Sequence, residues 1–472
     1  MNPTQRMGLL GATMALSLTG HAVQAQEQTA PAVPVAPASA QPTDNSDLKI
    51  LRDEIAELRE ELRKLKEANA PTPPGGTPAA GTSSPTPIQS TTSPNVVTRP
   101  QALKWYDNIT LRGYTQVRYN RLFETNPDLR NEQGDRSVGN NGGIFLRRMR
   151  LIFSGQVSKK VYFYVQPDFA SQTTSTQLHY GQLRDAYFDL GMDDKNEFRL
   201  RVGQSKIPYG FENMQSSQNR LPLDRSDGIN SSFTNERDLG VFFYYAPEKI
   251  RKRFADLVSS GLKGSGDYGV FGFGLFNGQT ANRPELNNQQ HFVARASYPF
   301  AIGKQIIEPG IQAYKGNFVI PTDQTSPGTI VNATRSYADE RVAASFVLYP
   351  QPFGIQAEYN WGKGPEFNPA TDTIETRNLH GGYVTFSYLT KLKEHTIIPF
   401  LRLHNYNGGK KHELDARSYR VREAEIGVEW QPNKNFELVG EYVFASRRAE
   451  DFVRQNNLQK GQLLRLQAQL NF

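Results

Sequence analysis

The sequence has no cysteine and no long apolar run, although it contains 472 residues. Without cysteine the fold cannot rely on disulfides, which suits an exported protein but would also suit a cytosolic one. A membrane-spanning helix needs about 18 to 20 consecutive apolar residues, and no stretch of the chain reaches that length. This absence excludes a helical membrane protein.

Histidine is also scarce, with seven in the whole chain. A hydrolase needs serine, histidine and a carboxylate or carboxamide together. His404 is the best histidine on a predicted strand, but it shares a face with Arg402 and no serine motif accompanies it. No metal-ligand spacing and no phosphate-binding glycine loop stands out. We therefore expect no enzymatic activity, no metal site and no cofactor.

Aromatic residues and glycine are plentiful instead, with 27 Phe, 21 Tyr and 39 Gly, while the mean hydropathy is negative. This composition is compatible with a membrane β-barrel, because only alternate residues of each strand must face lipid. The net charge is +7. Its basic residues are dispersed among strand-like segments, so we expect no nucleic-acid partner.

The first 25 residues have the form of a signal peptide. Arg6 is followed by the apolar stretch 7–18 and then by the small-residue pattern Val23-Gln24-Ala25, which is typical of a signal-peptidase site. We expect cleavage after Ala25. A short buried helix is the alternative interpretation of this stretch.

Residues 26–43 and 70–104 are rich in Ala, Pro, Thr, Ser and Gly and are predicted to be linkers. The segment 44–69 between them is predicted to form a short coiled-coil helix in the periplasm, with self-association through its apolar seam. Its seam residues are Leu48, Leu51, Ile55, Leu58, Leu62 and Leu65. The alternatives are one amphipathic helix lying on the barrel or on lipid, and a tether that reaches peptidoglycan.

From Trp105 to the end, the apolar pattern changes to a period of two, which predicts strands. Sixteen strands are expected, near 109–119, 144–155, 160–169, 182–190, 198–203, 237–246, 268–276, 291–300, 306–318, 340–349, 354–361, 382–390, 395–405, 419–430, 435–446 and 462–472. Long connections, including 120–143, 204–236, 319–339 and 362–381, alternate with short ones. The long, charged connection 247–267 falls where a short turn is expected.

This alternation predicts an all-β fold, a sixteen-stranded antiparallel transmembrane β-barrel over residues 105–472. A soluble β-sandwich would have no reason to sort its connections by length. The last strand places Leu464, Leu466, Ala468, Leu470 and Phe472 on one face. The terminal aromatic, Phe472, resembles the signal that barrel-assembly machinery reads in outer-membrane proteins.

Strand parity predicts which side chains face the lumen. Because a charge on the lipid side would cost about 2–4 kcal/mol at the bilayer midplane, the strand arginines should point inward to water. They are Arg112, Arg118, Arg148, Arg150, Arg199, Arg201, Arg295, Arg402 and Arg465, whereas Arg147 falls on the other face. Arginines can form an anion path. Alternatively they pair with inward acids, namely Asp185, Asp189, Glu358, Glu425 and Glu441.

Three segments resemble the phosphate- and polyphosphate-selective porin family, O/P type: RRMRLIFSG at 147–155, LRDAYFDL at 183–190 and FRLRVGQSKIPYGFEN at 198–213. The resemblance implies an outer-membrane trimer in a Gram-negative bacterium, with the segment 204–236 folded into the lumen as a constriction. By resemblance, Arg147, Arg148 and Arg150 match the basic strand of the family. Lys206 opens the constriction loop, and Arg220, Arg225 and Arg237 follow.

The expected function is therefore passive diffusion of small anions, with phosphate or polyphosphate as the implied solute. Many lysines lie in predicted turns rather than in the lumen: Lys159, Lys195, Lys304, Lys391 and Lys434. A general diffusion porin without phosphate selectivity therefore remains an alternative. A barrel-anchored envelope tether that acts through the coiled coil is a further one.

Overall fold

The computed structural model describes residues 105–123, 143–169 and 180–472, together with Glu60 and Lys64. The predicted signal peptide, both linkers and all six residues of the coiled-coil seam lie outside the described residues. They stay predictions.

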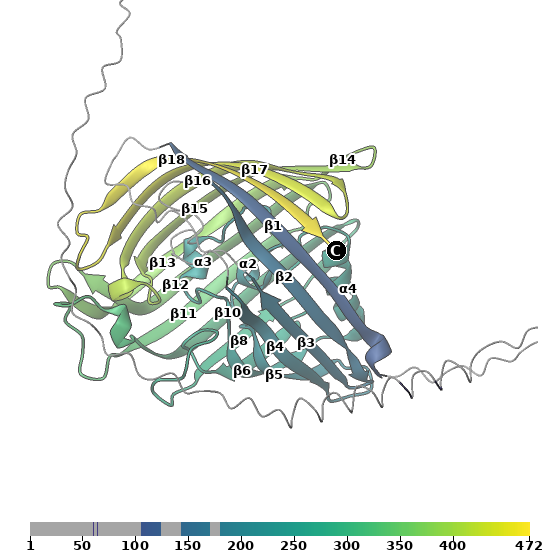
Figure 1. Ribbon diagram of the computed structural model, residues 1–472, viewed down its shortest axis with the longest axis horizontal. Helices are drawn as coiled ribbons and strands as arrows, with labels where there is room; N and C mark the ends of the chain where they lie inside the picture. The colour runs from purple at the N-terminus through teal and green to yellow at the C-terminus, as the bar shows by residue number, and fades with distance from the viewer. Residues whose placement is uncertain (1–59, 61–63, 65–104, 124–142, 170–179) are drawn as a thin grey trace, which may run out of the picture. The chain divides into compact units, whose positions relative to one another are not determined.

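The strands form one closed antiparallel barrel (Figure 1). Its first and last strands, β1 and β18, pair with each other, so that the sheet has no free edge there. Two positions in the barrel are each occupied by two consecutive strand segments. β8 and β9 both pair with β10, and β13 and β14 both pair with β15. Counting each of these positions once gives sixteen strands, which confirms the predicted sixteen-stranded barrel. A closed barrel satisfies the backbone hydrogen bonds within the sheet, as a lipid environment requires.

The first half of the barrel contains β1 (Ile109–Phe123), β2 (Gly143–Ser158), β3 (Val161–Asp168), β4 (Gln182–Gly191), β5 (Phe198–Lys206), β6 (Arg237–Tyr245), β7 (Phe271–Phe276), β8 (His291–Ser297), β9 (Phe300–Ile302) and β10 (Gln305–Val319). The second half contains β11 (Ser336–Leu348), β12 (Phe353–Asn368), β13 (Thr373–Tyr388), β14 (Thr390–Leu392), β15 (His395–Gly409), β16 (Ser418–Asn433), β17 (Phe436–Glu450) and β18 (Leu458–Asn471). The helices are η1 (Trp105–Asn108), α2 (Phe211–Met214), α3 (Asp227–Asn230), α4 (Glu248–Ser259), η2 (Thr322–Gln324) and η3 (Leu414–Ala416).

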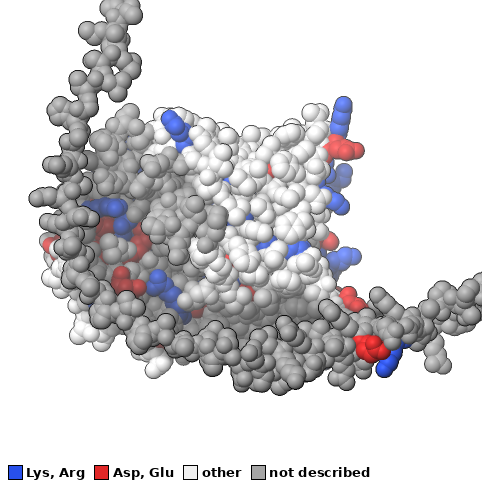
Figure 2. All heavy atoms as spheres, viewed as in Figure 1, with Lys and Arg blue, Asp and Glu red and all other residues white. Residues whose placement is uncertain are grey.

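The two ends of the barrel differ in their connections. The short-turn end carries tight turns such as Gly303-Lys304, and also η1, α4 and the C-terminus (Figure 1). The opposite, long-loop end carries connections such as 320–335. Lysine, arginine, aspartate and glutamate gather mainly at these two ends, whereas the wall between them is mostly uncharged (Figure 2). A lipid-facing band with polar rims has this distribution.

One predicted long loop, 362–381, is wrong. β12 and β13 continue through it and stay paired as far as Asn368 and Thr373, which leaves only 369–372 as the turn. Glycine, proline and asparagine in this stretch favoured a loop. Beyond the lipid, however, both faces of a hairpin can meet water, so its backbone can pair without any apolar alternation.

A β-bulge changes the parity of β2. Gln116 pairs with Arg148, but the next residue, Val117, pairs with Leu146, so Arg147 is the extra residue of the bulge. Upstream of the bulge the faces are exchanged. Phe145, which simple alternation assigns to lipid, is paired with the inward Arg118 and therefore lies on the lumen face.

The connection 247–267 is not only a charged loop, because it contains the helix α4. Its buried residues Ile250, Phe254 and Leu257 are spaced four and three apart and form one apolar face. No helix in the described ranges is long and apolar enough to cross a membrane.

Candidate functional site

The constriction loop, which we define as residues 207–236, folds into the lumen as the resemblance implies. Most of its residues are buried, and it contains α2 and α3. The Glu358 carboxylate on β12 accepts hydrogen bonds from the backbone N–H groups of Phe211 and Glu212, at 2.5 and 2.8 Å. A Cβ on Gly228 would lie 2.7 Å from the carbonyl carbon of Gly381. Only glycine allows the loop to approach β13 so closely.

Ion pairs fix the same loop to three further strands. Asp224 pairs with Arg118 of β1 at 2.9 Å and also with Arg465 of β18. Glu212 pairs with Arg402 of β15 at 2.9 Å. Two of the inward arginines, Arg118 and Arg402, therefore position the constriction loop.

Acids on the walls and in the loops neutralise most of the predicted arginines. The shortest contacts are Arg150–Asp168 at 2.7 Å, Arg201–Asp189 at 2.7 Å, Arg199–Asp267 at 2.7 Å, Arg237–Asp185 at 2.8 Å, Arg225–Glu236 at 2.8 Å and Arg295–Glu308 at 3.7 Å. The predicted acids Glu425 and Glu441 likewise pair with Arg402 and Arg465. Parity thus identified the inward face, but these side chains do not form a continuous free anion path.

Three further predicted residues bind neutral oxygens of the loop or the wall. Lys206 donates from Nζ to the carbonyl oxygens of Met214 and Gln215, at 2.8 and 2.6 Å. Arg148 donates to Oε1 of Gln116 at 2.9 Å, and Arg220 donates to a loop carbonyl at 3.2 Å. Lys206 consequently supports the fold of the constriction loop as well as lining the lumen.

A cavity of about 720 Å³, which we call the vestibule, lies between the β1–β5 wall, the constriction loop and α4. Nine lysines and arginines line it, against four acids, so the excess is five positive charges. The cations are Arg112, Lys160, Lys195, Arg199, Arg201, Lys206, Arg237, Arg251 and Lys252, and the acids are Asp185, Asp189, Glu248 and Asp267. Arg112 is exposed there and forms no ion pair or hydrogen bond with any other residue that the structure describes.

Tyrosines form much of the remaining vestibule wall: Tyr162, Tyr164, Tyr187 and Tyr268. The Arg201 guanidinium lies over the ring of Tyr187, 3.9 Å from its centroid, so a cation–π contact supports its position beside Asp189. The vestibule therefore offers hydroxyl donors and cations to a solute.

The segment 248–266 crosses the short-turn end of the lumen. The buried face of α4 packs against Phe211 of the constriction loop and against Val347 and Tyr349 beyond it. Further along, Lys263 pairs with Glu429 of β16 at 2.5 Å. Strands β6 and β16 are eight strand positions apart in a barrel of sixteen, so they lie on opposite sides of the lumen. The sequence argument missed this crossing, although the spacing of the apolar residues was the available signal.

Two acids in the connections are held ionised. Burial raises the pKa of Glu236, but Arg225, Arg184 and Arg237 outweigh burial and hold the pKa at about 2. Burial likewise raises the pKa of Asp267, and Arg199 and Arg251 more than offset it, so the pKa is lowered. The negative charge of Asp267 connects α4, through Arg251, to Arg199 on the β5 wall.

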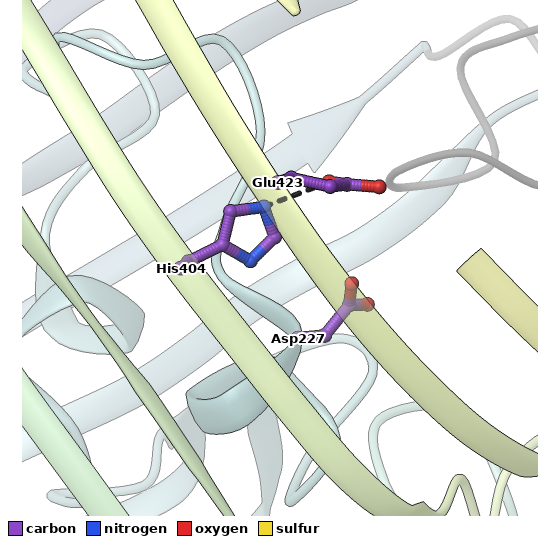
Figure 3. Close-up of side chains that lie close together, drawn as sticks. All are labelled: Asp227, His404 and Glu423. Carbon is purple, nitrogen blue, oxygen red and sulfur yellow. Dashed lines mark hydrogen bonds and ion pairs between the residues drawn. The ribbon is translucent and has the colours of Figure 1, made fainter. Parts of the chain in front are cut away.

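Figure 3 shows a cluster of Asp227, His404 and Glu423, whose potential ligand atoms lie within 4.8 Å of one another. His404 Nε2 is 2.7 Å from Glu423. Arg447 lies 2.8 Å from both Asp227 and Glu423, and Lys410 also pairs with Asp227. Because these cations already balance the carboxylates, we assign the cluster to anchoring the constriction loop and not to metal binding.

The profile of the family described as phosphate-selective porin O and P matches residues 125–472. The chain belongs to this family. It is therefore an outer-membrane porin, a channel protein rather than an enzyme, and its short-turn end is the periplasmic end.

Solved porin structures are similar to the chain at low sequence identity. The outer-membrane channel DcaP of Acinetobacter baumannii is 15% identical, covering 78% of this chain and 99% of its own, with a TM-score of 0.49. Salmonella typhi OmpF is 14% identical, covering 77% and 98%, with a TM-score of 0.50. An anion-selective porin from Comamonas acidovorans is 9% identical, covering 77% and 99%, with a TM-score of 0.44. A comparison with curated proteins found no match.

Proposed function

We propose that this porin conducts small anions by passive diffusion in preference to cations, and that phosphate is among its solutes. The observation that carries the proposal is the vestibule, where nine cations face four acids. Fixed positive charge attracts anions and repels cations, and the effect is largest at low ionic strength. Residues of α4 and of the constriction loop both line this cavity, so on this proposal a solute passes through it.

Phosphate suits the chemistry of the vestibule. A guanidinium can bind two phosphate oxygens at once, and Arg112 has its donors unoccupied by the described residues. The tyrosine hydroxyls nearby add neutral donors. The family description supports phosphate as a solute for this chain, and polyphosphate would use the same donors.

A general diffusion porin is the second candidate, and the ion pairs favour it. Since Arg150, Arg201 and Arg237 each face an acid within 3 Å, their net field is weaker than that of free cations. If the channel is a general diffusion porin, the remaining excess of positive charge is too small to select anions over cations.

The test is the reversal potential of single channels in planar bilayers under a KCl gradient. We expect the wild type to prefer chloride, phosphate to block the chloride current, and Arg112→Glu to shift the preference toward potassium and weaken the block. Lys304→Glu, in an exposed turn outside the lumen, is the matched control and should behave as wild type. A wild-type channel without anion preference would contradict the proposal and would favour the general diffusion porin.

We also propose that the protein assembles as a homotrimer whose coiled coil lies in the periplasm. The heptad seam over 44–69 supports self-association, because three heptads are marginal alone but become effective when tethered to barrels in one membrane. On this proposal, peptidoglycan is a further partner of this helix.

A further inference from the structure

Four basic residues lie together on the outer wall at the long-loop end: Arg420 and Arg422 of β16, Arg448 of β17 and Lys460 of β18. Their chain neighbours Val421, Arg447 and Gln459 are almost fully buried on the lumen side, at 1%, 0% and 1% exposure. Since side chains alternate along a strand, the four basic residues point away from the lumen. We call them the outer basic cluster.

The outer basic cluster has no ion-pair partner among the described residues, although Glu366 and Glu450 line a pocket beside Arg420 and Arg448. None of its four side chains forms an ion pair or hydrogen bond with another residue in the described part of the chain. Arg420 and Arg448 are direct cross-strand partners, an arrangement of like charges that destabilises a sheet. These two acids accept hydrogen bonds from neutral donors, Glu366 from the Ser418 hydroxyl and Glu450 from the backbone of Asn456, and neither forms an ion pair with a cation of the cluster. Two acids against four cations leave the cluster with an excess of positive charge. The cluster is thus a site that an external anion would stabilise.

The height of the cluster matches the edge of the membrane. On β16 the outward residues Ile426, Val428 and Trp430 are apolar, and Arg420 lies ten residues from Trp430. At about 3.3 Å per residue and a strand tilt of about 40°, ten residues rise about 25 Å, which is the usual height of the apolar band of a porin. The basic side chains therefore lie where the head groups of the outer leaflet begin.

A groove runs from the cluster along the same wall. It encloses about 1190 Å³ and is lined in part by the small residues Ala357, Gly382 and Ala424, with Phe346 and Phe444 among the larger ones. Arg420 and Arg422 line it too. Polar residues such as Asn405 and Asn407 also line it. A groove of mixed lining, with apolar side chains along it and cations at its rim, complements a lipid that has acyl chains and a phosphorylated head.

We propose that this groove is a binding site for a phosphate-bearing lipid of the outer leaflet, with the phosphates on the outer basic cluster and acyl chains along the groove. A second copy of the chain suits the site less well, because it would have to supply free acids. Glu340, an outward acid of β11 on the far side of the groove, is already paired with Lys315 and Lys363, at 3.2 Å each.

The experiment uses the full-length protein in detergent and measures its retention of purified lipid A by native mass spectrometry, compared with dephosphorylated lipid A. We expect Arg420→Gln/Arg422→Gln/Arg448→Gln to retain lipid A at least about tenfold less well, because the variant removes three charged contacts to phosphate. Lys315→Gln/Lys363→Gln, which changes outward cations that already have an acid, is the control and should retain lipid A normally.

Heat-modifiable electrophoretic mobility and unchanged conductance establish that the triple variant is folded, because none of its three residues lines the vestibule. Equal retention of phosphorylated and dephosphorylated lipid, or full retention by the triple variant, would overturn the proposal. So would efficient disulfide cross-linking between copies through Ser446→Cys, beside Arg422 on the same face, because it would identify the wall as a protein interface.

Discussion

At the scale of single residues, the inward arginines differ in what surrounds them. Arg118 and Arg402 hold the constriction loop, Arg150 and Arg201 pair with wall acids, and Arg112 faces the vestibule without a described partner. Reversing the charge of an arginine should therefore change a different property of the porin at each position. Selectivity should respond to Arg112, whereas stability should respond to the paired arginines.

Arg150 provides the test of this distinction. Its guanidinium donates to Asp168 at 2.7 Å, and both side chains are almost fully buried. Arg150→Met leaves Asp168 with only the distant Arg184 at 3.9 Å, and we expect a loss of about 3–5 kcal/mol of stability. Thermal unfolding in detergent measures it. The double variant Arg150→Met/Asp168→Leu should recover much of the loss, and a single variant as stable as wild type would contradict the argument.

At the scale of elements, the path through the barrel is narrowed from two sides. The constriction loop enters between β5 and β6, and α4 enters between β6 and β7. They touch through Phe211, whose ring belongs to the same apolar cluster as Phe254. The position of α4 thus depends on its contact with the constriction loop. The width of the periplasmic opening of the lumen depends in turn on the position of α4.

Replacing Phe254 tests the role of α4. Phe254→Asp places a charge in the apolar contact with Phe211 and Tyr349. We therefore expect α4 to detach from the constriction loop and the single-channel conductance to rise. Asp256→Ala, on the exposed face of the same helix, is the control and should conduct as wild type. Unchanged conductance of Phe254→Asp in a folded barrel would show that α4 does not limit the current.

The lowered pKa of the Asp267 carboxylate predicts how the conductance of the channel changes with pH. Its pKa is lowered in the folded protein, so its stabilising contacts are complete above the unfolded pKa of about 3.9 and are lost only as the pH falls through the folded pKa. Conductance should stay level from neutral pH down to about pH 4 and rise in stronger acid. Asp267→Asn should show the higher conductance already at neutral pH and lack this acid step. A rise near pH 6 in the wild type would point to another group.

At the scale of the whole molecule, the chain end takes part in closing the barrel between β1 and β18. Gly113 of β1 exchanges both backbone hydrogen bonds with Phe472, at 2.7 and 3.0 Å, and a Cβ on Gly113 would lie 2.7 Å from the Phe472 ring. The terminal aromatic therefore lies over a glycine of the first strand. Its role as an assembly signal stays a prediction.

Oligomerisation is tested through the predicted coiled coil. Ile55→Asp/Leu58→Asp places charges in the seam, and we expect it to abolish chemical cross-linking of the N-terminal segments between barrels. Glu57→Gln, outside the seam, is the control. If cross-linking of the double variant persists at the wild-type level, the helix has another role. Trimers that survive without it would show that the barrel walls associate by themselves.

The sequence by itself determined the barrel. Alternation with a period of two is a local property, because lipid on one face and water on the other act on each strand separately, and so the sixteen strands and the inward face of most arginines could be predicted. The order of long and short connections, together with the motifs around Arg150 and Lys206, predicted the family and the inward loop.

Only the tertiary structure decided which charges are neutralised and what narrows the lumen. Arg118 meets Asp224 across 106 positions of the chain, and Arg402 meets Glu212 across 190. No local pattern encodes such pairs, because they depend on where the loop crosses the closed barrel. The position of α4 follows for the same reason, because its apolar face packs against Phe211, Val347 and Tyr349, which lie elsewhere in the sequence.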